Sequence, residues 1–201
     1  MTIEAVIFDI GNVLVRLDYQ LAEQQFRLRI RNDTEQASEE FVALKNGLEL
    51  GEISQETFLR KSIQVLDFRG RPDEFAAIWN GIFSPNEEME KFVVRIKDSL
   101  PLYLLSNTSE LHLNYLKERF DIFRYFADGV YSFRAKCAKP DAKIFEMAAK
   151  QFGVAPARAI FVDDLAPNVE SAAACGIHAI QYDWRRHAEF TESVLHRLSR
   201  E

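Results

Sequence analysis

The sequence predicts an α/β fold in which helices cover a doubly wound parallel sheet and a small helical module is inserted near the N-terminus. Apolar runs at residues 5–8, 102–105 and 159–162 each stop at a polar residue, which is typical of strands buried on both faces of a parallel sheet. From residue 85 onward, helix and strand patterns alternate, whereas residues 16–84 show helical periodicity without a convincing strand.

The expected core helices have recognisable ends. Ser84, Pro85 and Glu87 match a helix cap, a proline at the first position and an acid at the third, so a helix is expected over about 85–98. Three further helices are expected: from a cap at 107–109 to about 120, from Pro140 to the residue before Gly153, and from Pro167 to the residue before Gly176. Weaker strand candidates lie at 130–133 and 178–182, and the mixed charges after Trp184 indicate a solvated C-terminal helix.

The N-terminal helical segment is expected to be a separate module. It is too long for one crossover between neighbouring strands, which favours an insertion over ordinary covering helices. The expected organisation is a core of residues 1–15 and 85–201 and a helical cap of residues 16–84.

The composition restricts the possible partners. The 201 residues include 31 acidic and 25 basic ones, a net charge of −6, which disfavours nucleic-acid binding. Asp9 and Arg16 interrupt the longest apolar stretch, so no membrane span is expected, and Cys137 and Cys175 lack metal or redox spacing. With no basic leader, we expect a cytoplasmic monomer or homodimer that acts on a small molecule.

Polar side chains follow three of the predicted strands. These strands end at Asp9, at Ser106 and at the pair Asp163 and Asp164, and ligands bind at the carboxyl ends of the strands in parallel sheets. Three close carboxylates repel one another unless a cation lies among them, and their hard oxygens suit Mg²⁺. The alternative is that these acids are unrelated helix caps.

A lysine and a polar loop each lie just before an expected helix of the core. Lys139 precedes an expected helix start and could neutralise a carboxylate and a phosphoryl group, with Lys136 as a competitor, although Lys139-Pro140-Asp141 also fits an ordinary surface loop. Residues 106–108 precede a helix, so their hydroxyl, amide and backbone N–H groups could bind an anion or serve only as a cap.

Four ordered segments resemble the motifs of the haloacid dehalogenase-like (HAD) hydrolase superfamily. They are FDIGNVLV at 8–15, LLSNT at 104–108, AKPDAKIF at 138–145 and FVDDLAPNVESAAACGI at 161–177. The resemblance implies a Rossmann-like core with a helical cap inserted after the first motif. It also implies hydrolysis of small phosphate monoesters with Mg²⁺ as cofactor.

The resemblance implies roles for individual residues. Asp9 would be the nucleophile that forms an aspartyl-phosphate, a covalent intermediate that divides one difficult step into two. Ser106 would bind the phosphoryl oxygens together with Asn12 and Asn107, and Lys139 would steady Asp9 and the phosphate.

The resemblance also implies a metal site. Asp9, Asp164 and the backbone carbonyl of Gly11 would be direct Mg²⁺ ligands, and Asp163 would hold a metal-bound water. Asn168 would organise the surroundings of these ligands.

Gly11 departs from the pattern of the family's phosphatases, which usually have an aspartate there as a proton shuttle. Three interpretations follow. The chain resembles a minority branch with a DxGN form of the first motif, which includes phosphatases of sugar phosphates such as glucose 1-phosphate. In that case Asp18 is the nearest carboxylate in the sequence that could replace the missing proton shuttle. The alternative is that Asp18 is a solvated or capping acid.

The other two interpretations are a dehalogenase and a catalytically weak binding or regulatory protein. Haloacid dehalogenases also lack the second aspartate, but they need no metal and lose the acidic pair that Asp163 and Asp164 form here. In the cap, Glu49, Glu52 and Trp79 could face the substrate or could be cap surface and cap core, so the sequence does not identify the substrate.

Overall fold

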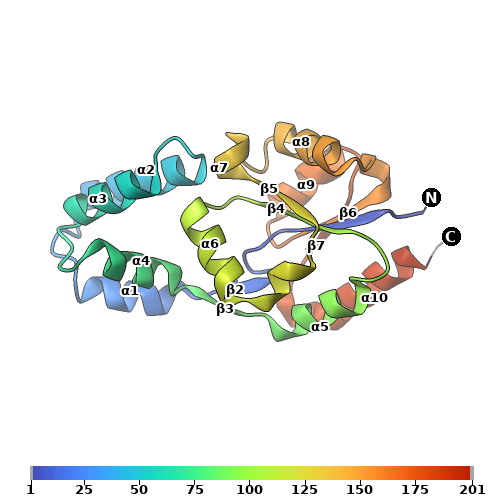
Figure 1. The fold of residues 1–201 in the computed structure, drawn as a ribbon, viewed down its shortest axis with the longest axis horizontal. Helices are drawn as coiled ribbons and strands as arrows, with labels where there is room; N and C mark the ends of the chain where they lie inside the picture. The colour runs from blue at the N-terminus through green and yellow to red at the C-terminus, as the bar shows by residue number, and fades with distance from the viewer. Residues whose placement is uncertain (1, 200–201) are drawn as a thin grey trace.

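The computed structural model describes residues 2–199 as a parallel sheet between two helix layers, with a group of helices at one end (Figure 1). The sheet has five parallel strands in the order β5-β4-β1-β6-β7. Its strands are β1 (Ala5–Phe8), β4 (Leu102–Ser106), β5 (Asp128–Tyr131), β6 (Ala159–Asp163) and β7 (His178–Gln181). The predicted doubly wound α/β fold is confirmed.

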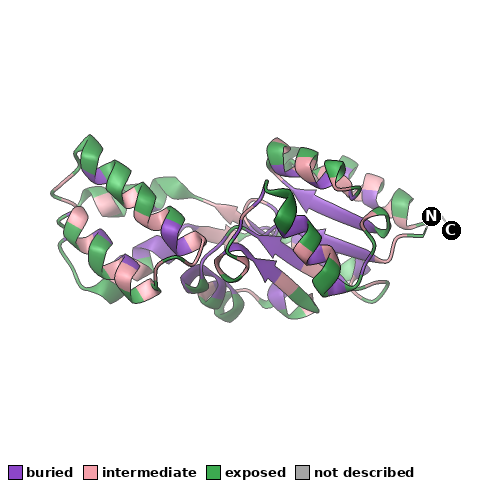
Figure 2. Cartoon of the chain, turned by 90° about the horizontal axis from the view of Figure 1, so that it is seen from above, coloured by how far each residue is buried: buried purple, intermediate pink, exposed green. Residues whose placement is uncertain are grey.

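Both faces of the sheet are buried. The covering helices are α5 (Glu87–Ile96), α6 (Glu110–Arg119), α8 (Ala142–Phe152), α9 (Ala166–Ala174) and α10 (His187–Leu198). Along β1, Val6 and Phe8 pack with α5, α6 and α10, whereas Ala5 and Ile7 pack with α8 and α9. This is why β1 is apolar at every position and not only at alternate ones. Figure 2 shows the strands buried along most of their length and the helices exposed on their outer sides.

Four helices lie between β1 and α5 in the chain and form a group that we call the helical cap. They are α1 (Tyr19–Arg27), α2 (Glu35–Glu49), α3 (Gln55–Val65) and α4 (Pro72–Asn80). Their shared cluster of aromatic side chains includes Phe58 and Phe75, which are fully buried, and Trp79, which stacks on His112 of α6 at 5.4 Å between ring centroids. The cap therefore packs both on itself and against the core.

A two-stranded antiparallel ribbon joins the cap to the core and corrects two predictions. The ribbon pairs β2 (Val15–Leu17) with β3 (Phe83–Pro85), where the sequence predicts no strand and a helix start at Pro85. The helix α5 begins at Glu87 instead, because β3 pairs with β2 and Asn86 is held by the core. The Asn86 side chain donates hydrogen bonds to the Val13 carbonyl at 2.7 Å and the Tyr182 hydroxyl at 3.1 Å.

Two further boundaries differ from the sequence prediction. The strand expected at 130–133 is β5 at Asp128–Tyr131, because its pairing ends where β4 ends, and Ser132 opens the short helix α7 (Ser132–Ala135). Helix α8 begins at Ala142 and not at Pro140, since the Asp141 carboxylate caps it by accepting a hydrogen bond from the Lys143 backbone. Across residues 2–199, none of the helices has the length and apolarity that crossing a membrane requires.

Candidate active site

Three acidic side chains meet at the carboxyl edge of the sheet. Strands β1 and β6 are neighbours, and Asp9 follows the first while Asp163 ends the second, with Asp164 next to it. One carboxylate oxygen from each of these three residues lies within 4.8 Å of the others. The convergence predicted from strand ends is therefore present in the structure.

Lys139 is the cation among these carboxylates. Its ammonium lies 2.7 Å from Asp9 Oδ1 and 2.6 Å from Asp163 Oδ2, and its side chain is 1% exposed. The Asn107 side chain fixes the Lys139 backbone, because its amide donates to the Lys139 carbonyl at 2.9 Å and accepts from the Lys139 N–H at 2.8 Å. Asn107, which the resemblance assigns to phosphate binding, thus positions the lysine.

The two consecutive acids have different surroundings. Asp163 is fully buried and accepts hydrogen bonds from the Leu165 N–H and from the Asn168 amide, in addition to its contact with Lys139. Asp164 is partly exposed, and the Asn12 amide donates to its Oδ2 at 3.1 Å. Asp164 is therefore the more accessible oxygen ligand.

Burial dominates the electrostatics of the cluster. It raises the pKa of Asp9 to about 6, although the Lys139 ammonium acts in the opposite direction and the Asp163 carboxylate adds to the rise. Burial also raises the pKa of Asp164. Three carboxylates and one ammonium carry a net charge of −2, and their hard oxygens suit a divalent cation such as Mg²⁺.

A cavity of about 70 Å³ lies between the cap and the core beside this cluster. Its core side includes Gly11 from the turn after β1, and Ser106 and Asn107 at the end of β4. Its cap side includes Glu49 at the end of α2 and Trp79 of α4. Groups that can bind a small molecule thus lie next to groups that can react with it.

Residues 3–176 match the family model of haloacid dehalogenase-like hydrolases. This chain is a haloacid dehalogenase-like hydrolase. The predicted family membership is therefore confirmed.

Known proteins resemble this HAD-like hydrolase over most of its length. A D-ribitol-5-phosphate phosphatase of Bacteroides thetaiotaomicron is 27% identical, over 92% of this chain and 96% of the relative. A crystal structure of a HAD family enzyme from the same organism, in complex with magnesium and inorganic phosphate, has 23% identity and a TM-score of 0.79 over 90% of this chain and 94% of the other. A predicted HAD-like family hydrolase of Porphyromonas gingivalis has 24% identity and a TM-score of 0.81, with full coverage of both chains.

The turn at Gly11 is crowded. A Cβ atom on this residue would lie 3.1 Å from Leu17 Cδ1 and 3.9 Å from Asp9 Oδ2. Asn12 adopts a left-handed conformation with φ of 52°, and its side-chain oxygen accepts a hydrogen bond from the Leu17 N–H at 3.2 Å. The Asn12 side chain therefore links the turn to β2 and to Asp164, instead of standing free for a phosphate.

The other candidate carboxylates of the HAD-like hydrolase, Asp18, Glu49 and Glu52, lie in different places in the structure. Asp18 is exposed and caps α1 by accepting a hydrogen bond from the Gln20 N–H, which is the capping role that the sequence also allows. Glu52 is exposed and lines a different surface groove on the cap, whereas Glu49 lines the cavity. Lys136, the competitor of Lys139, binds the Gly51 carbonyl of the cap.

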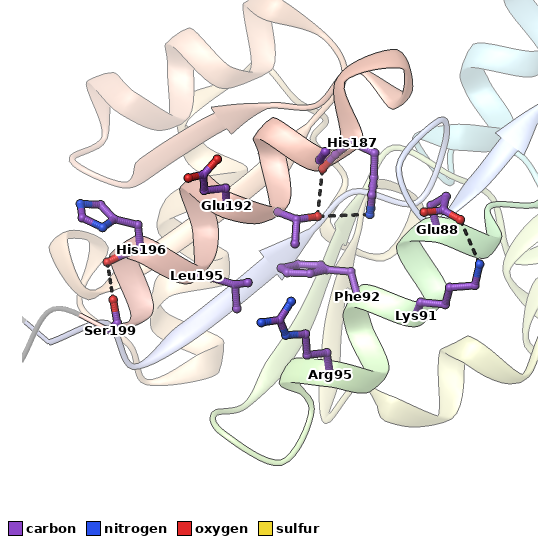
Figure 3. Close-up of a pocket in the computed structure, with 11 residues that line it drawn as sticks. Glu88, Lys91, Phe92, Arg95, His187, Glu192, Leu195, His196 and Ser199 are labelled. Carbon is purple, nitrogen blue, oxygen red and sulfur yellow. Dashed lines mark hydrogen bonds and ion pairs between the residues drawn. The ribbon is translucent and has the colours of Figure 1, made fainter.

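A larger groove lies away from the acidic cluster. It has a volume of about 750 Å³ and runs between α5 and α10, with Phe92 and Leu195 inside it (Figure 3). His187 in this groove already contacts the Tyr182 hydroxyl at 3.1 Å and the Thr191 hydroxyl at 3.2 Å. The lining of this groove comes from α5 and α10, whereas the smaller cavity is lined by Ile10 and Gly11, which directly follow Asp9 in the chain. The smaller cavity is therefore the one next to the acidic cluster.

Sequence reasoning missed three residues at the site. Lys45 and Tyr19 line the cavity from α2 and α1, and the buried Ser132 hydroxyl connects the core to Glu49 of the cap. The spacing of Lys45 and Glu49, four positions apart on one helix, was a usable signal. Tyr19 and Ser132 reach the site only through tertiary packing.

Proposed function

We propose that this hydrolase is a Mg²⁺-dependent phosphatase that acts on small sugar or polyol phosphates through an aspartyl-phosphate on Asp9. The observation that carries the proposal is the cluster of three carboxylates and Lys139, of which Asp164 alone is partly exposed, beside a small cavity under the cap. A net charge of −2 in a buried site calls for a divalent cation and an anionic substrate bound with it.

The described residues fit a magnesium ion. Asp9, Asp164 and the Gly11 carbonyl would hold it directly. Asp163 would hold a metal-bound water and would not bind the ion itself, because its oxygens already accept hydrogen bonds from Lys139, Asn168 and the Leu165 N–H. Bound Mg²⁺ neutralises the carboxylates and polarises the phosphoryl oxygens.

Asp9 has the properties of a nucleophile at neutral pH. Its pKa of about 6 leaves it largely ionised at pH 7, and the Lys139 contact on Oδ1 holds the carboxylate in one orientation. Ser106, buried at the end of the neighbouring strand β4, lines the cavity on the same side and would bind the phosphoryl oxygens. Lys139 would also offset the negative charge that develops on the transferring phosphoryl group.

The cavity and the phosphatase relative support a small, hydroxylated leaving group. About 70 Å³ is well below the volume of pockets that hold drug-sized ligands. The described residues of its lining include the Lys45 ammonium and the Glu49 carboxyl group, 3.5 Å apart, and both can form hydrogen bonds to hydroxyl groups. A short polyol or sugar fits these conditions, and the relative named D-ribitol-5-phosphate phosphatase supports the same class.

The test is phosphate release from a panel of sugar and polyol phosphates and from p-nitrophenyl phosphate, with Mg²⁺ or with a chelator. We expect release that needs Mg²⁺ and disappears in Asp9→Asn, but not in Asp128→Asn, a control at an exposed position on β5. Radioactive phosphate trapped on the wild-type protein and absent from Asp9→Asn would support the covalent intermediate. Chloride release from 2-chloropropionate would instead favour a dehalogenase, and silence with all substrates a binding or regulatory role.

A further inference from the structure

The proton donor that Gly11 lacks must come from elsewhere in this site. An alcohol is a poor leaving group unless it is protonated as its bond to phosphorus breaks, and the attacking water must lose a proton in the second step. Among the described residues that line the cavity, Glu49 is the one carboxylate.

We propose that Glu49 of the cap is the catalytic acid and base of this hydrolase, in place of the side chain missing at Gly11. The inference rests on the proposed phosphatase function and adds a catalytic residue to it. Glu49 is the last residue of α2, its side chain is 24% exposed, and it lines the cavity together with Gly11 and Ser106.

The backbone of Glu49 is fixed to the core. The Ser132 hydroxyl lies 2.6 Å from the Glu49 carbonyl and also accepts a hydrogen bond from the Thr108 N–H at 3.0 Å. Thr108 belongs to the loop after β4, two residues after Ser106, which ends that strand. One buried hydroxyl therefore ties the cap residue to the loop that would bind phosphate.

A second contact secures the same cap segment. The Lys136 ammonium donates a hydrogen bond to the Gly51 carbonyl, two residues after Glu49. At Gly51, which has φ of 64°, a Cβ would collide with the Phe133 carbonyl of α7, so only glycine allows the cap to approach the core this closely. These two contacts hold the backbone of residues 49–51 against the core, next to the cavity that Glu49 lines.

The surroundings of Glu49 favour a group that can carry a proton. Burial raises its pKa, and the Lys45 ammonium opposes this rise. A carboxylate at the C-terminal end of a helix also faces the negative end of the helix dipole, which favours the protonated form. Burial raises the pKa of Tyr19, and the charges of Glu49 and Asp164 add to the rise, so Tyr19 lies within electrostatic range of both carboxylates.

Other candidate groups fit the role of catalytic acid and base less well than Glu49. Asp18 caps α1 and Glu52 faces a different groove. His112 lines the cavity, but its Nε2 is sealed from solvent and burial lowers its pKa to about 4. Tyr19 and Lys45, which also line the cavity, are the remaining competitors and are included in the test.

The proposed steps balance in protons and electrons. An Asp9 oxygen forms a bond to phosphorus while the ester P–O bond breaks, and the leaving oxygen keeps the electron pair and takes the proton of the Glu49 carboxyl. The Glu49 carboxylate then takes a proton from water as the water oxygen attacks phosphorus. The acyl-phosphate P–O bond breaks, its electron pair returns to Asp9, and the net reaction is ester plus water to alcohol plus phosphate.

The test compares Glu49→Gln on two leaving groups. The first substrate is the sugar or polyol phosphate of the panel that the wild type turns over fastest, and the second is p-nitrophenyl phosphate, whose phenolate leaves without a proton. With the alkyl ester we expect kcat to fall by about 10²–10⁴, the usual contribution of a general acid. With the aryl ester we expect a burst of nitrophenolate at a rate within about tenfold of the wild type, followed by slow turnover because the base is also missing.

Three variants serve as comparisons. Glu52→Gln, three residues further along the cap, should match the wild type on both substrates. The proposal is overturned if Glu49→Gln loses the same factor on both esters in the first step, or if Glu52→Gln behaves like it. It is also overturned if the dependence on leaving group appears in Tyr19→Phe or Lys45→Met and not in Glu49→Gln. Failure of the phosphatase proposal itself would look different, because the wild type would then release no phosphate or Asp9→Asn would keep the activity.

Discussion

Removing the ammonium of Lys139 should destabilise the protein strongly, because it leaves two buried carboxylates without their cation. The Lys139 ammonium lies 2.7 Å from Asp9 Oδ1 and 2.6 Å from Asp163 Oδ2, and the Lys139 and Asp163 side chains are almost completely buried. Lys139→Met keeps the length of the side chain and removes its charge. Loss of one partner of a buried ion pair costs about 3–5 kcal/mol.

This free energy corresponds to a fall in Tm of roughly 6–20 °C for a domain of this size. The assay is thermal and urea unfolding at pH 7 in the presence of a chelator, with Lys143→Met as the control. Lys143 lies four residues away at the start of α8, is exposed, and should tolerate the change with little effect.

The loss of stability in Lys139→Met relative to the wild type should also depend on pH, and it should be larger at higher pH. Without Lys139, the pKa of Asp9 rises further above its unfolded value, so the native state holds a proton that the unfolded chain has released. The stability of the variant then falls as the pH rises, and the deficit against the wild type is larger at pH 7 than at pH 4. A Lys139→Met protein within 1 kcal/mol (about the value of one ordinary interaction) of Lys143→Met at pH 7 would refute this reasoning.

Three further predictions concern the turn, the cap interface and a buried histidine. Gly11→Asp should lower stability by about 1–3 kcal/mol, because its side chain crowds Leu17, and Gly11→Asp combined with Leu17→Ala should recover part of the loss in urea unfolding. Ser132→Ala should cost about 1–3 kcal/mol by leaving buried backbone groups unpaired, and it should lower kcat on alkyl esters more than on p-nitrophenyl phosphate, because the Glu49 carbonyl loses its anchor. His112 has a native pKa of about 4, below its ordinary 6.5, so the unfolded chain gains a proton first as the pH falls. The wild type should therefore lose about 3 kcal/mol between pH 6.5 and 4 that His112→Phe does not lose, and parallel stability curves would contradict this.

The strands of the core could be predicted because burial on both faces requires a continuous run of apolar residues, which is visible in the sequence. In β1 and β6 the residues of both alternating sets are buried, so each strand is a continuous apolar run that stops where the site begins. Parallel pairing then requires Asp9 and Asp163 to lie at the same edge. The location of the acidic cluster follows from these two facts, without knowledge of any side-chain contact.

The ribbon and the cap interface could not be predicted in this way. Ser84, Pro85 and Glu87 satisfy a local rule for a helix start, but the pairing of β3 with β2 and the two hydrogen bonds of Asn86 to the core outweigh it. The amides of Asn12 and Asn107 look equally suited to bind phosphate in the sequence. Their partners, Asp164 and the Lys139 backbone, lie far away in the chain and are known only from the fold.

The site is divided between the core and the cap, and different physical requirements act on the residues of each part. Charge balance restricts the core residues, and packing restricts the cap residues. Asp9, Asp163 and Lys139 form a closed electrostatic unit on elements of the core, so a change in any of them alters the charge balance of the others. Glu49 and Trp79 reach the cavity from helices whose packing depends on the aromatic cluster of the cap. Substitutions in the cap can therefore reshape the cavity without disturbing the carboxylates. This is why the position of the carboxylates follows from the strand ends, whereas the shape of the cavity depends on how α2 and α4 pack against the core.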